Sequence, residues 1–293
     1  MPREGGYLFV HVGFSKEEKP TLFLQNGEEI ISFQPDEGPL TLTFDTKERF
    51  CSGWYDMKSG ISYVCPDHSI VDKKFDNCPA CQQRTGFNPA FYHATSVSAQ
   101  QEERNLEPHL LYLAHFGEGI VKVGISHAAR NRSRLLEQGA RSATILETFP
   151  TAHIARQYEA QIAALPGIVE TLQVQRKIKT LTEKYDNSKA RNELLATKER
   201  IEKTIGKTFS QTEVQAFDSV YFPKGSPKLE DAFNTSDLNM ISGKSIGMLG
   251  SFLFCLQQDT PVFLSLKKYI GYPVTLSFAE TNIALPAQQM SFF

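Results

Sequence analysis

Four of the five cysteines in this 293-residue chain lie close together, in a segment that has little else to hold it folded. Their spacing is Cys51-x13-Cys65-x12-Cys78-Pro-Ala-Cys81, and the residues around them are rich in Gly, Pro, Asp and Asn. A segment with so few core-forming residues usually needs a staple such as a metal ion. The Cys-x-x-Cys turn directs two thiolates at one ion, and two further thiolates complete the closed tetrahedral site of a structural zinc. We therefore predict a zinc site made by Cys51, Cys65, Cys78 and Cys81.

The sequence leaves three other uses of these cysteines open. His68, in the stretch Cys65-Pro-Asp-His68, could replace Cys51 as a ligand, because the gap from Cys51 to Cys65 is wide. Disulfides would require an oxidising compartment. Cys78 and Cys81 could form a redox pair, although no thioredoxin-like βαβ pattern surrounds them.

The composition is that of an ordinary globular chain. It has 41% hydrophobic and 22% charged residues and a formal net charge of -2, so any nucleic-acid contact must come from a local basic patch. No apolar run reaches the roughly 18 to 20 residues that span a bilayer, and the N-terminus lacks the pattern of an export signal. We therefore expect a cytoplasmic protein without a membrane partner. Cys255, within an apolar stretch, is interpreted as a buried core thiol.

Apolar runs and turn residues predict an α+β protein built from successive units. Short alternating runs predict an N-terminal β meander in residues 1–50, followed by the zinc-ribbon-like module with four cysteines in 51–93. A polar linker leads to a central β-β-α-β-α unit in 109–168. Spacings of three and four residues predict a helical segment in 169–220, and alternating strands predict a small C-terminal β unit in 221–293.

Within the central unit, each expected element follows from a run of apolar residues. LLYLAHF and IVKVGIS, joined by a GEG turn, predict a β hairpin, and SATILETF predicts a third strand. A helix is expected over 127–138 with Ser126 as candidate N-cap, and a second helix over 151–165. Further on, Gly206 is expected to end the helical pattern, and residues 210–213 (SQTE) resemble a capping box that opens another short helix.

The central unit also carries residues suited to phosphodiester chemistry. Tyr112 lies in the first expected strand, Lys122 and Gly124 in the second, Arg134 on the first helix and Glu159 on the second. A carboxylate can hold Mg²⁺ or Mn²⁺, and an arginine can neutralise charge that develops on a phosphate. A tyrosine hydroxyl can orient or deprotonate water. We predict Tyr112, Lys122, Arg134 and Glu159 as catalytic residues, with Glu159 as the ligand of the divalent metal.

These residues, in this order, resemble the GIY-YIG nuclease superfamily. The matching stretches are Leu110–Ala114, Lys122–Ser126, Arg134–Gln138 and Tyr158-Glu159. The resemblance implies that Tyr112, Gly124, Arg134 and Glu159 take the places of the first-motif tyrosine, the second-motif glycine, the helix arginine and the metal-binding glutamate. It departs at Lys122, which replaces the second-motif tyrosine and can bind phosphate but cannot act as the same hydroxyl donor. With the zinc ribbon added, the chain resembles a group of uncharacterised bacterial proteins that join such a ribbon to this fold.

A basic cluster overlaps the same unit and indicates the kind of partner. Its members are Lys122, Arg130, Arg132, Arg134 and Arg141, and Glu137 is the only acidic residue from 122 to 141. Such a cluster would hold the phosphates of DNA or RNA through salt-sensitive contacts. Arg130 and Arg132 are also alternatives to Arg134 as the catalytic arginine.

Two hypotheses for the function follow. The first is a zinc-containing, divalent-metal-dependent phosphodiesterase that cleaves DNA or RNA. The alternative is a catalytically inactive nucleic-acid-binding protein that retains the fold and the basic face. Tyr112, Arg134 and Glu159 together favour the enzyme, whereas Lys122 favours the inactive protein.

Overall fold

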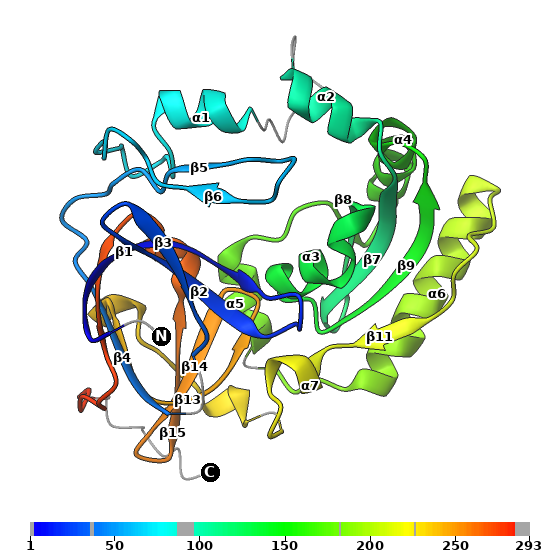
Figure 1. Ribbon diagram of the computed structural model, residues 1–293. Coiled ribbons are helices and arrows are strands. Elements are labelled where there is room, and N and C mark those ends of the chain that lie inside the picture. Colours follow the sequence, from blue (N-terminus) through cyan, green and yellow to red (C-terminus); the bar gives the residue numbers. More distant parts are fainter. Residues whose placement is uncertain (1–2, 36–37, 87–96, 182, 226, 285–293) are drawn as a thin grey trace, which may run out of the picture.

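The protein has a mixed α+β fold, as predicted (Figure 1). The computed structural model describes residues 3–35, 38–86, 97–181, 183–225 and 227–284. Within these residues the strands form a nine-stranded sheet, a five-stranded sheet and a two-stranded ribbon. The end of the expected cysteine module, residues 87–93, and the end of the expected C-terminal unit, residues 285–293, lie outside the described part of the chain.

Strands from both ends of the sequence build the large sheet (Figure 1). From edge to edge they are β12 (Phe233–Asn234), β15 (Thr260–Ser265), β14 (Phe252–Gln257), β13 (Met240–Leu249), β4 (Pro39–Phe44), β16 (Pro273–Ser277), β1 (Gly5–Phe14), β2 (Pro20–Asn26) and β3 (Glu29–Phe33). The β12–β15 pair is parallel and the other neighbours are antiparallel. β1, β2 and β3 form a meander, but β4 is separated from it by β16.

The expected division between an N-terminal unit (1–50) and a C-terminal unit (221–293) does not describe this sheet. Val274 of β16 lies opposite Tyr7 of β1 on one side and Phe44 of β4 on the other. A strand's backbone N–H and C=O groups need partners on both edges, and the C-terminal strands supply them to β1 and β4. Alternation in the sequence reports which face of a strand is buried and leaves its neighbour unspecified.

Apolar side chains from both ends of the sequence also share the core of this sheet. The core includes Leu22 and Leu24 of β2, Leu42 of β4, Leu253 and Cys255 of β14, and Val262 and Leu264 of β15. Cys255 is fully buried, which confirms its predicted place in the core.

The central unit forms the five-stranded sheet, with strand order β10 (Ile168–Val169), β8 (Ile120–His127), β7 (His109–Gly117), β9 (Ser142–Phe149) and β11 (Val214–Ala216). The middle strand, β7, is buried along its whole length. Leu111 and Leu113 pack with α4 (Ala152–Ala163) and α6 (Asn187–Ile205). Tyr112 and Phe116 pack on the other face, with α3 (Asn131–Gln138) and β14. Burial on both faces explains the continuous apolar run of this strand.

The expected order β-β-α-β-α is present as β7, β8, α3, β9 and α4, with one difference at the start of α3. β8 continues through Ser126, which lies opposite Leu110 in the hairpin, so Ser126 does not cap the helix. Instead, the His127 ring accepts a hydrogen bond from the Ala129 N–H at 3.2 Å and caps a 3₁₀ turn, η1 (Ala128–Arg130). Ser126, which the local sequence predicted as the helix cap, is thus part of the strand pairing instead.

The helical segment expected in 169–220 is shorter and divided. The helices of this region are α5 (Val174–Leu181), α6 and α7 (Asp218–Tyr221). Later in the chain there are short 3₁₀ turns, namely η2 (Leu229–Asp231), η3 (Ser236–Leu238) and η4 (Leu266–Tyr269). Asp186 caps α6, and Gly206 ends it in the left-handed conformation, as predicted. Residues 210–213 lead into β11 instead of a helix, because β11 pairs with the edge of β9. No helix in the described part of the chain is long and apolar enough to cross a membrane.

The two large sheets pack directly on each other. Gly139, which ends α3 with φ 74°, lies against Gly250 in the β13–β14 turn, and a Cβ on Gly250 would be 2.8 Å from the Gly139 Cα. The Tyr221 hydroxyl donates a hydrogen bond to the Ala140 carbonyl at 2.8 Å. One apolar cluster runs from β7 and α3 through α7 to β14, so the sheets share a core.

The cysteine module lies beside the β2–β3 hairpin (Figure 1). It contains β5 (Trp54–Tyr55), β6 (Ser62–Tyr63) and α1 (Pro79–Thr85), and α2 (Ala99–Asn105) connects it to β7. Arg49 joins the module to the large sheet, because its side chain donates to the Lys73 carbonyl at 2.7 Å and to the Ile270 carbonyl at 2.8 Å.

Candidate functional site

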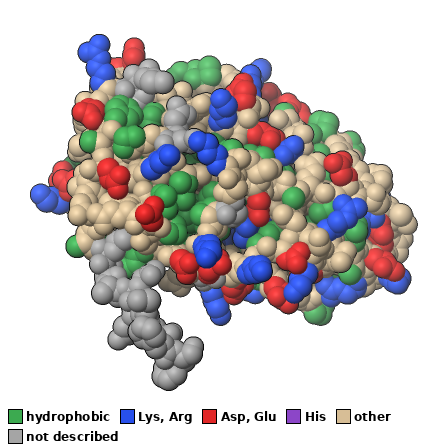
Figure 2. Space-filling model, turned by 90° about the horizontal axis from the view of Figure 1, so that it is seen from below, with side chains coloured by type: hydrophobic (Ala, Val, Ile, Leu, Met, Phe, Trp, Pro, Cys, Tyr) green, Lys and Arg blue, Asp and Glu red, His purple; other side chains and the backbone are tan. Residues whose placement is uncertain are grey.

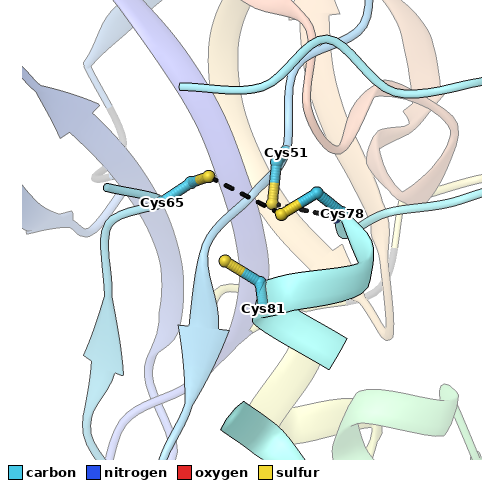
Figure 3. Close-up of side chains that lie close together, drawn as sticks. All are labelled: Cys51, Cys65, Cys78 and Cys81. Carbon is cyan, nitrogen blue, oxygen red and sulfur yellow. Dashed lines mark hydrogen bonds between the residues drawn. The ribbon is translucent and has the colours of Figure 1, made fainter. Parts of the chain in front are cut away.

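All four predicted zinc ligands come together in the cysteine module (Figure 3). The Sγ atoms of Cys51, Cys65, Cys78 and Cys81 lie within 4.8 Å of one another, and all four residues are buried. A tetrahedral zinc with bonds of about 2.3 Å holds its sulfurs about 3.8 Å apart, and the Cys65 and Cys78 sulfurs are 3.9 Å apart. The four cysteines are therefore positioned to hold a metal ion, consistent with structural zinc. Four thiolates leave no ligand position for water, so such an ion would hold the fold together and take no part in a reaction.

The start of α1 positions two of the ligands. Cys78 is the N-cap of this helix, and Pro at its first position lets the helix begin at once, which brings Cys81 into the first turn. The backbone N–H of Cys78 donates to the Cys51 sulfur at 3.1 Å. Such N–H···S contacts favour the charged thiolate that a metal requires.

A tight loop positions the other two ligands. Gly53 has a φ of 88°, and a Cβ there would lie 1.9 Å from the Tyr63 carbonyl oxygen, so only glycine lets β5 and β6 approach this closely. The Asn77 amide donates to the Gly53 carbonyl at 2.7 Å. Trp54 stacks on Tyr63 with ring centroids 4.3 Å apart and packs against the cysteines. Trp54, backed by Tyr63, thus packs on the sulfur cluster.

The chemistry of the donor set also fits a metal. Burial raises the pKa of the Cys51 thiol to about 11 and also raises the pKa of Cys81, so several buried thiolates need a cation beside them. The His68 ring lies outside the cluster, 3.1 Å from Glu28 Oε1 and 3.5 Å from Gln25 Nε2. The four cysteines are free thiols rather than disulfides. The four-cysteine set is therefore favoured over the set containing His68.

Of the second group of predicted residues, Tyr112, Lys122 and Arg134 lie on the face of β7 and β8 that α3 covers. Tyr112 and Gly124 lie opposite each other in the hairpin. A Cβ on Gly124 would be 2.4 Å from the Tyr112 Oη and 3.0 Å from the Lys122 Nζ. The glycine thus makes room for both polar groups. Burial lowers the pKa of Lys122 to about 8, although the charge of Glu159 opposes this.

Helix α3 brings two side chains to the Tyr112 hydroxyl. Burial raises the pKa of Tyr112, and the Arg134 charge acts in the opposite direction. The hydroxyl accepts a hydrogen bond from Gln138 Nε2 at 2.6 Å. Gln138 had no predicted role. The signal that could have found it is its spacing, since residues 134 and 138 lie one turn apart on the same face of the helix.

Glu159 lies on α4 and acts on this group through its charge. It is 3% exposed, and its charge acts on both Tyr112 and Lys122. Burial raises the pKa of Glu159, and the ion pair with Arg156 opposes that rise. Arg156 also contacts Glu170 Oε1 at 2.9 Å. Arg156 was not predicted, although its position three residues before Glu159 on a helix is a detectable signal.

Comparison with known proteins identifies a family. The sequence model of DUF2797, described as a protein of unknown function, matches residues 58–274. The chain belongs to the DUF2797 family. No curated protein and no solved structure matches the chain. The DUF2797 match contains Cys65, Cys78 and Cys81 and the whole group around Tyr112, and it begins after Cys51.

In this DUF2797 protein the predicted basic cluster does not form one surface. Arg141 is 4% exposed, and its guanidinium forms two hydrogen bonds with the Asp218 carboxylate, at 2.9 and 2.7 Å. The predicted contact of Arg141 with nucleic acid does not fit this placement, because the side chain is enclosed and its charge is neutralised. Two other members are in ion pairs, Arg130 with Glu137 and Arg132 with Glu18.

The two remaining members of the basic cluster are the ones that approach Tyr112. Lys122 and Arg134 interact electrostatically with each other and with the tyrosine site. On the face of the DUF2797 protein shown in Figure 2, by contrast, basic and acidic side chains are interleaved and do not gather by sign. Two predicted cations therefore lie near Tyr112, and the charge of the predicted carboxylate, Glu159, acts on both Tyr112 and Lys122.

Proposed function

We propose that this DUF2797 protein binds nucleic acid and cleaves it as a divalent-metal-dependent phosphodiesterase, through a GIY-YIG-like centre in its five-stranded sheet. The observation that supports the proposal is the electrostatic interaction among four functional groups from four elements. They are the Tyr112 hydroxyl of β7, the Lys122 ammonium of β8, the Arg134 guanidinium of α3 and the Glu159 carboxylate of α4. A phenol, two cations and a carboxylate supply hydrogen bonding, charge neutralisation and metal binding for phosphodiester cleavage.

The pKa shifts divide the roles among these groups. Because burial raises the pKa of Tyr112, the phenol stays protonated at neutral pH and would donate a hydrogen bond to a phosphate oxygen or to the attacking water. Lys122, with a pKa of about 8, is mostly charged at pH 7. Together with Arg134 it would neutralise charge on the phosphate.

Glu159 is the residue that would hold Mg²⁺ or Mn²⁺, since carboxylate oxygens are the ligands that these ions prefer. When bound, such an ion polarises a phosphate oxygen and activates water. Arg156 now contacts this carboxylate, so it would have to turn toward Glu170, its second partner. A cation would thus stay beside the buried carboxylate whether or not the divalent ion is bound.

The alternative, a protein that binds nucleic acid without cleaving it, has support of its own. Arg156 already satisfies the Glu159 carboxylate, and Lys122 stands where the resemblance implies a second tyrosine hydroxyl. In this alternative Lys122 and Arg134 bind phosphate, while Glu159 only balances the charge of Arg156. The two functions differ in whether Glu159 is needed for a reaction.

A cleavage assay separates them. The purified, zinc-loaded chain is incubated with Mn²⁺ and with single-stranded, duplex and branched DNA and RNA, beside the variants Glu159→Gln and Glu199→Gln. We expect cleavage by the wild type and a loss of about 10²-fold or more in Glu159→Gln, the size of effect seen when one catalytic charge contact is removed. Glu199 is exposed on α6 and forms an ion pair with Lys203, so Glu199→Gln should cleave like the wild type.

Two results would decide against the enzyme. Cleavage that persists unchanged in Glu159→Gln contradicts the metal-binding role. Salt-sensitive binding without cleavage, equal in the wild type and Glu159→Gln, supports the inactive alternative. Matching thermal unfolding curves for the three proteins show that any loss is chemical and not a loss of fold.

A further inference from the structure

Lys177 lies beside the proposed centre, although no motif contains it. It belongs to α5, which packs across the end of β7, where a Cβ on Gly117 would be 3.0 Å from the Thr180 side chain. The Lys177 Nζ donates a hydrogen bond to the Gln138 carbonyl at 2.5 Å. Gln138 is the residue whose side chain donates to the Tyr112 hydroxyl, so a single residue links Lys177 to the centre.

Two lysine ammonium groups lie near aromatic rings on the same face of β7. Side chains two residues apart on a strand share a face, so Tyr112 and Phe116 point the same way, and both belong to the core cluster facing α3. The Lys122 Nζ lies 5.8 Å from the centroid of the Tyr112 ring, and the Lys177 Nζ lies 5.1 Å from that of the Phe116 ring. Arg134 lies one turn before Gln138 on α3. Three cationic side chains from β8, α3 and α5 therefore surround one strip of this face.

The strip has more positive than negative charge. Burial lowers the pKa of Lys177 to about 8, and the charges that add to this effect belong to Lys267, Lys122 and Arg134, all of them cations. The carboxylates that act on Lys122 belong to Glu159 and Glu170, and both are already paired with Arg156. Partly buried cations that lack a matching carboxylate are unfavourable, and an anion between them removes that cost. Lys122, Arg134 and Lys177 are each partly exposed.

We infer that Lys177, Lys122 and Arg134 bind a phosphate group of the nucleic-acid backbone, with Lys177 supplied by α5 from outside the GIY-YIG-like residues. This inference rests on the proposed function, because it assigns the substrate contact of the same centre. A lysine ammonium binds phosphate as a point charge, and the guanidinium of Arg134 binds it with directed hydrogen bonds. Lys177 holds the phosphate in place beside the reacting groups and is a binding residue, not a catalytic one.

The test measures binding without cleavage. Thymidine 3′,5′-bisphosphate, which carries two phosphates of one backbone unit, is titrated calorimetrically into the full zinc-loaded chain at low salt without divalent metal. We expect Lys177→Met to weaken binding by about tenfold or more, the usual size of a lost charge-assisted hydrogen bond. Lys177→Arg should restore affinity to within about threefold of the wild type, since it keeps the charge. Lys179→Met, on the exposed side of the same helix, should bind like the wild type.

Inorganic phosphate, titrated in parallel, separates the two sources of the anion. Weaker binding of inorganic phosphate than of the bisphosphate supports a backbone ligand, and equal affinity for both contradicts it. The inference also fails if the wild type does not bind the bisphosphate, or if Lys177→Met binds it as tightly as the wild type does.

This outcome is independent of the proposed cleavage. If Lys177→Met loses binding and the wild type does not cleave nucleic acid, the phosphate site stands and the phosphodiesterase proposal fails. If cleavage depends on Glu159 and both binding and cleavage are unchanged in Lys177→Met, the enzyme stands and the role of Lys177 fails.

Discussion

Gly124 lies opposite Tyr112 in the central hairpin, and its missing side chain is what allows the tyrosine hydroxyl and the Lys122 ammonium to meet. The two groups occupy the space that a Cβ would fill, and the Tyr112 ring cannot move away easily because it is 2% exposed and hydrogen-bonded to Gln138. The backbone conformation of Gly124 is not left-handed. The glycine is therefore required for space and not for its backbone freedom.

Gly124→Ala tests this requirement. The new Cβ would lie 2.4 Å from the Tyr112 Oη, so the ring or the strand must shift, and overpacking of this kind costs about 1–3 kcal/mol. We expect the free energy of unfolding, measured by urea titration, to fall by that amount. The binding of thymidine 3′,5′-bisphosphate should also weaken. Gly6→Ala is the control, because a Cβ at Gly6 would meet nothing within 4 Å; its stability should change by no more than about 0.5 kcal/mol. Equal stability of both variants would show that the hairpin has more room than these distances allow.

At the scale of elements, the described part of the cysteine module, residues 51–86, has short strands and one seven-residue helix around four sulfurs. Such pieces bury little apolar surface, so a metal can contribute on the order of 10 kcal/mol to their folding. We expect one zinc per chain by elemental analysis of natively purified protein, and a strong loss of zinc and of thermal stability in Cys81→Ser. Cys255→Ala, which removes a cysteine from the large sheet, should keep its zinc. Zinc content that is unchanged in Cys81→Ser, or absent from the wild type, would contradict the site.

The elements also show how far the sequence could lead. The strands of the N-terminal meander and the order β-β-α-β-α were predictable, because apolar alternation and turn residues act locally. The cysteine cluster was predictable because Cys-x-x-Cys geometry is local as well. The pairing of β16 with β4 was not, since hydrogen bonds between strands more than two hundred residues apart leave no local pattern. The same holds for Lys177 at the centre and for Asp218 beside Arg141, which meet their partners only through tertiary packing.

At the scale of the whole molecule, the nine-stranded and five-stranded sheets share one apolar cluster. Phe254 of β14 is fully buried in it, with ring centroids 5.4 Å from Phe222 and 5.5 Å from Phe263. The same cluster contains Tyr112 of the proposed centre and Leu136 of α3. A sheet that packs one of its two faces against its neighbour is not expected to unfold alone. The proposed centre therefore depends on a core that the N- and C-terminal strands help to build.

Phe254→Ala tests this dependence from outside the centre. Removing a buried phenylalanine costs about 3–5 kcal/mol, so we expect the melting temperature to fall by on the order of 10 °C. Helices α4 and α6 belong to a different apolar cluster from Phe254. Their far-ultraviolet helical signal should nevertheless be lost in the same single transition as the near-ultraviolet signal of the aromatic core. Phe75→Ala, which removes a ring that is 53% exposed on the cysteine module, should leave that transition nearly unchanged. If the helical signal of Phe254→Ala instead melts at the wild-type temperature, in a separate step, the five-stranded sheet is an independent domain, and its centre can be studied on a shorter chain.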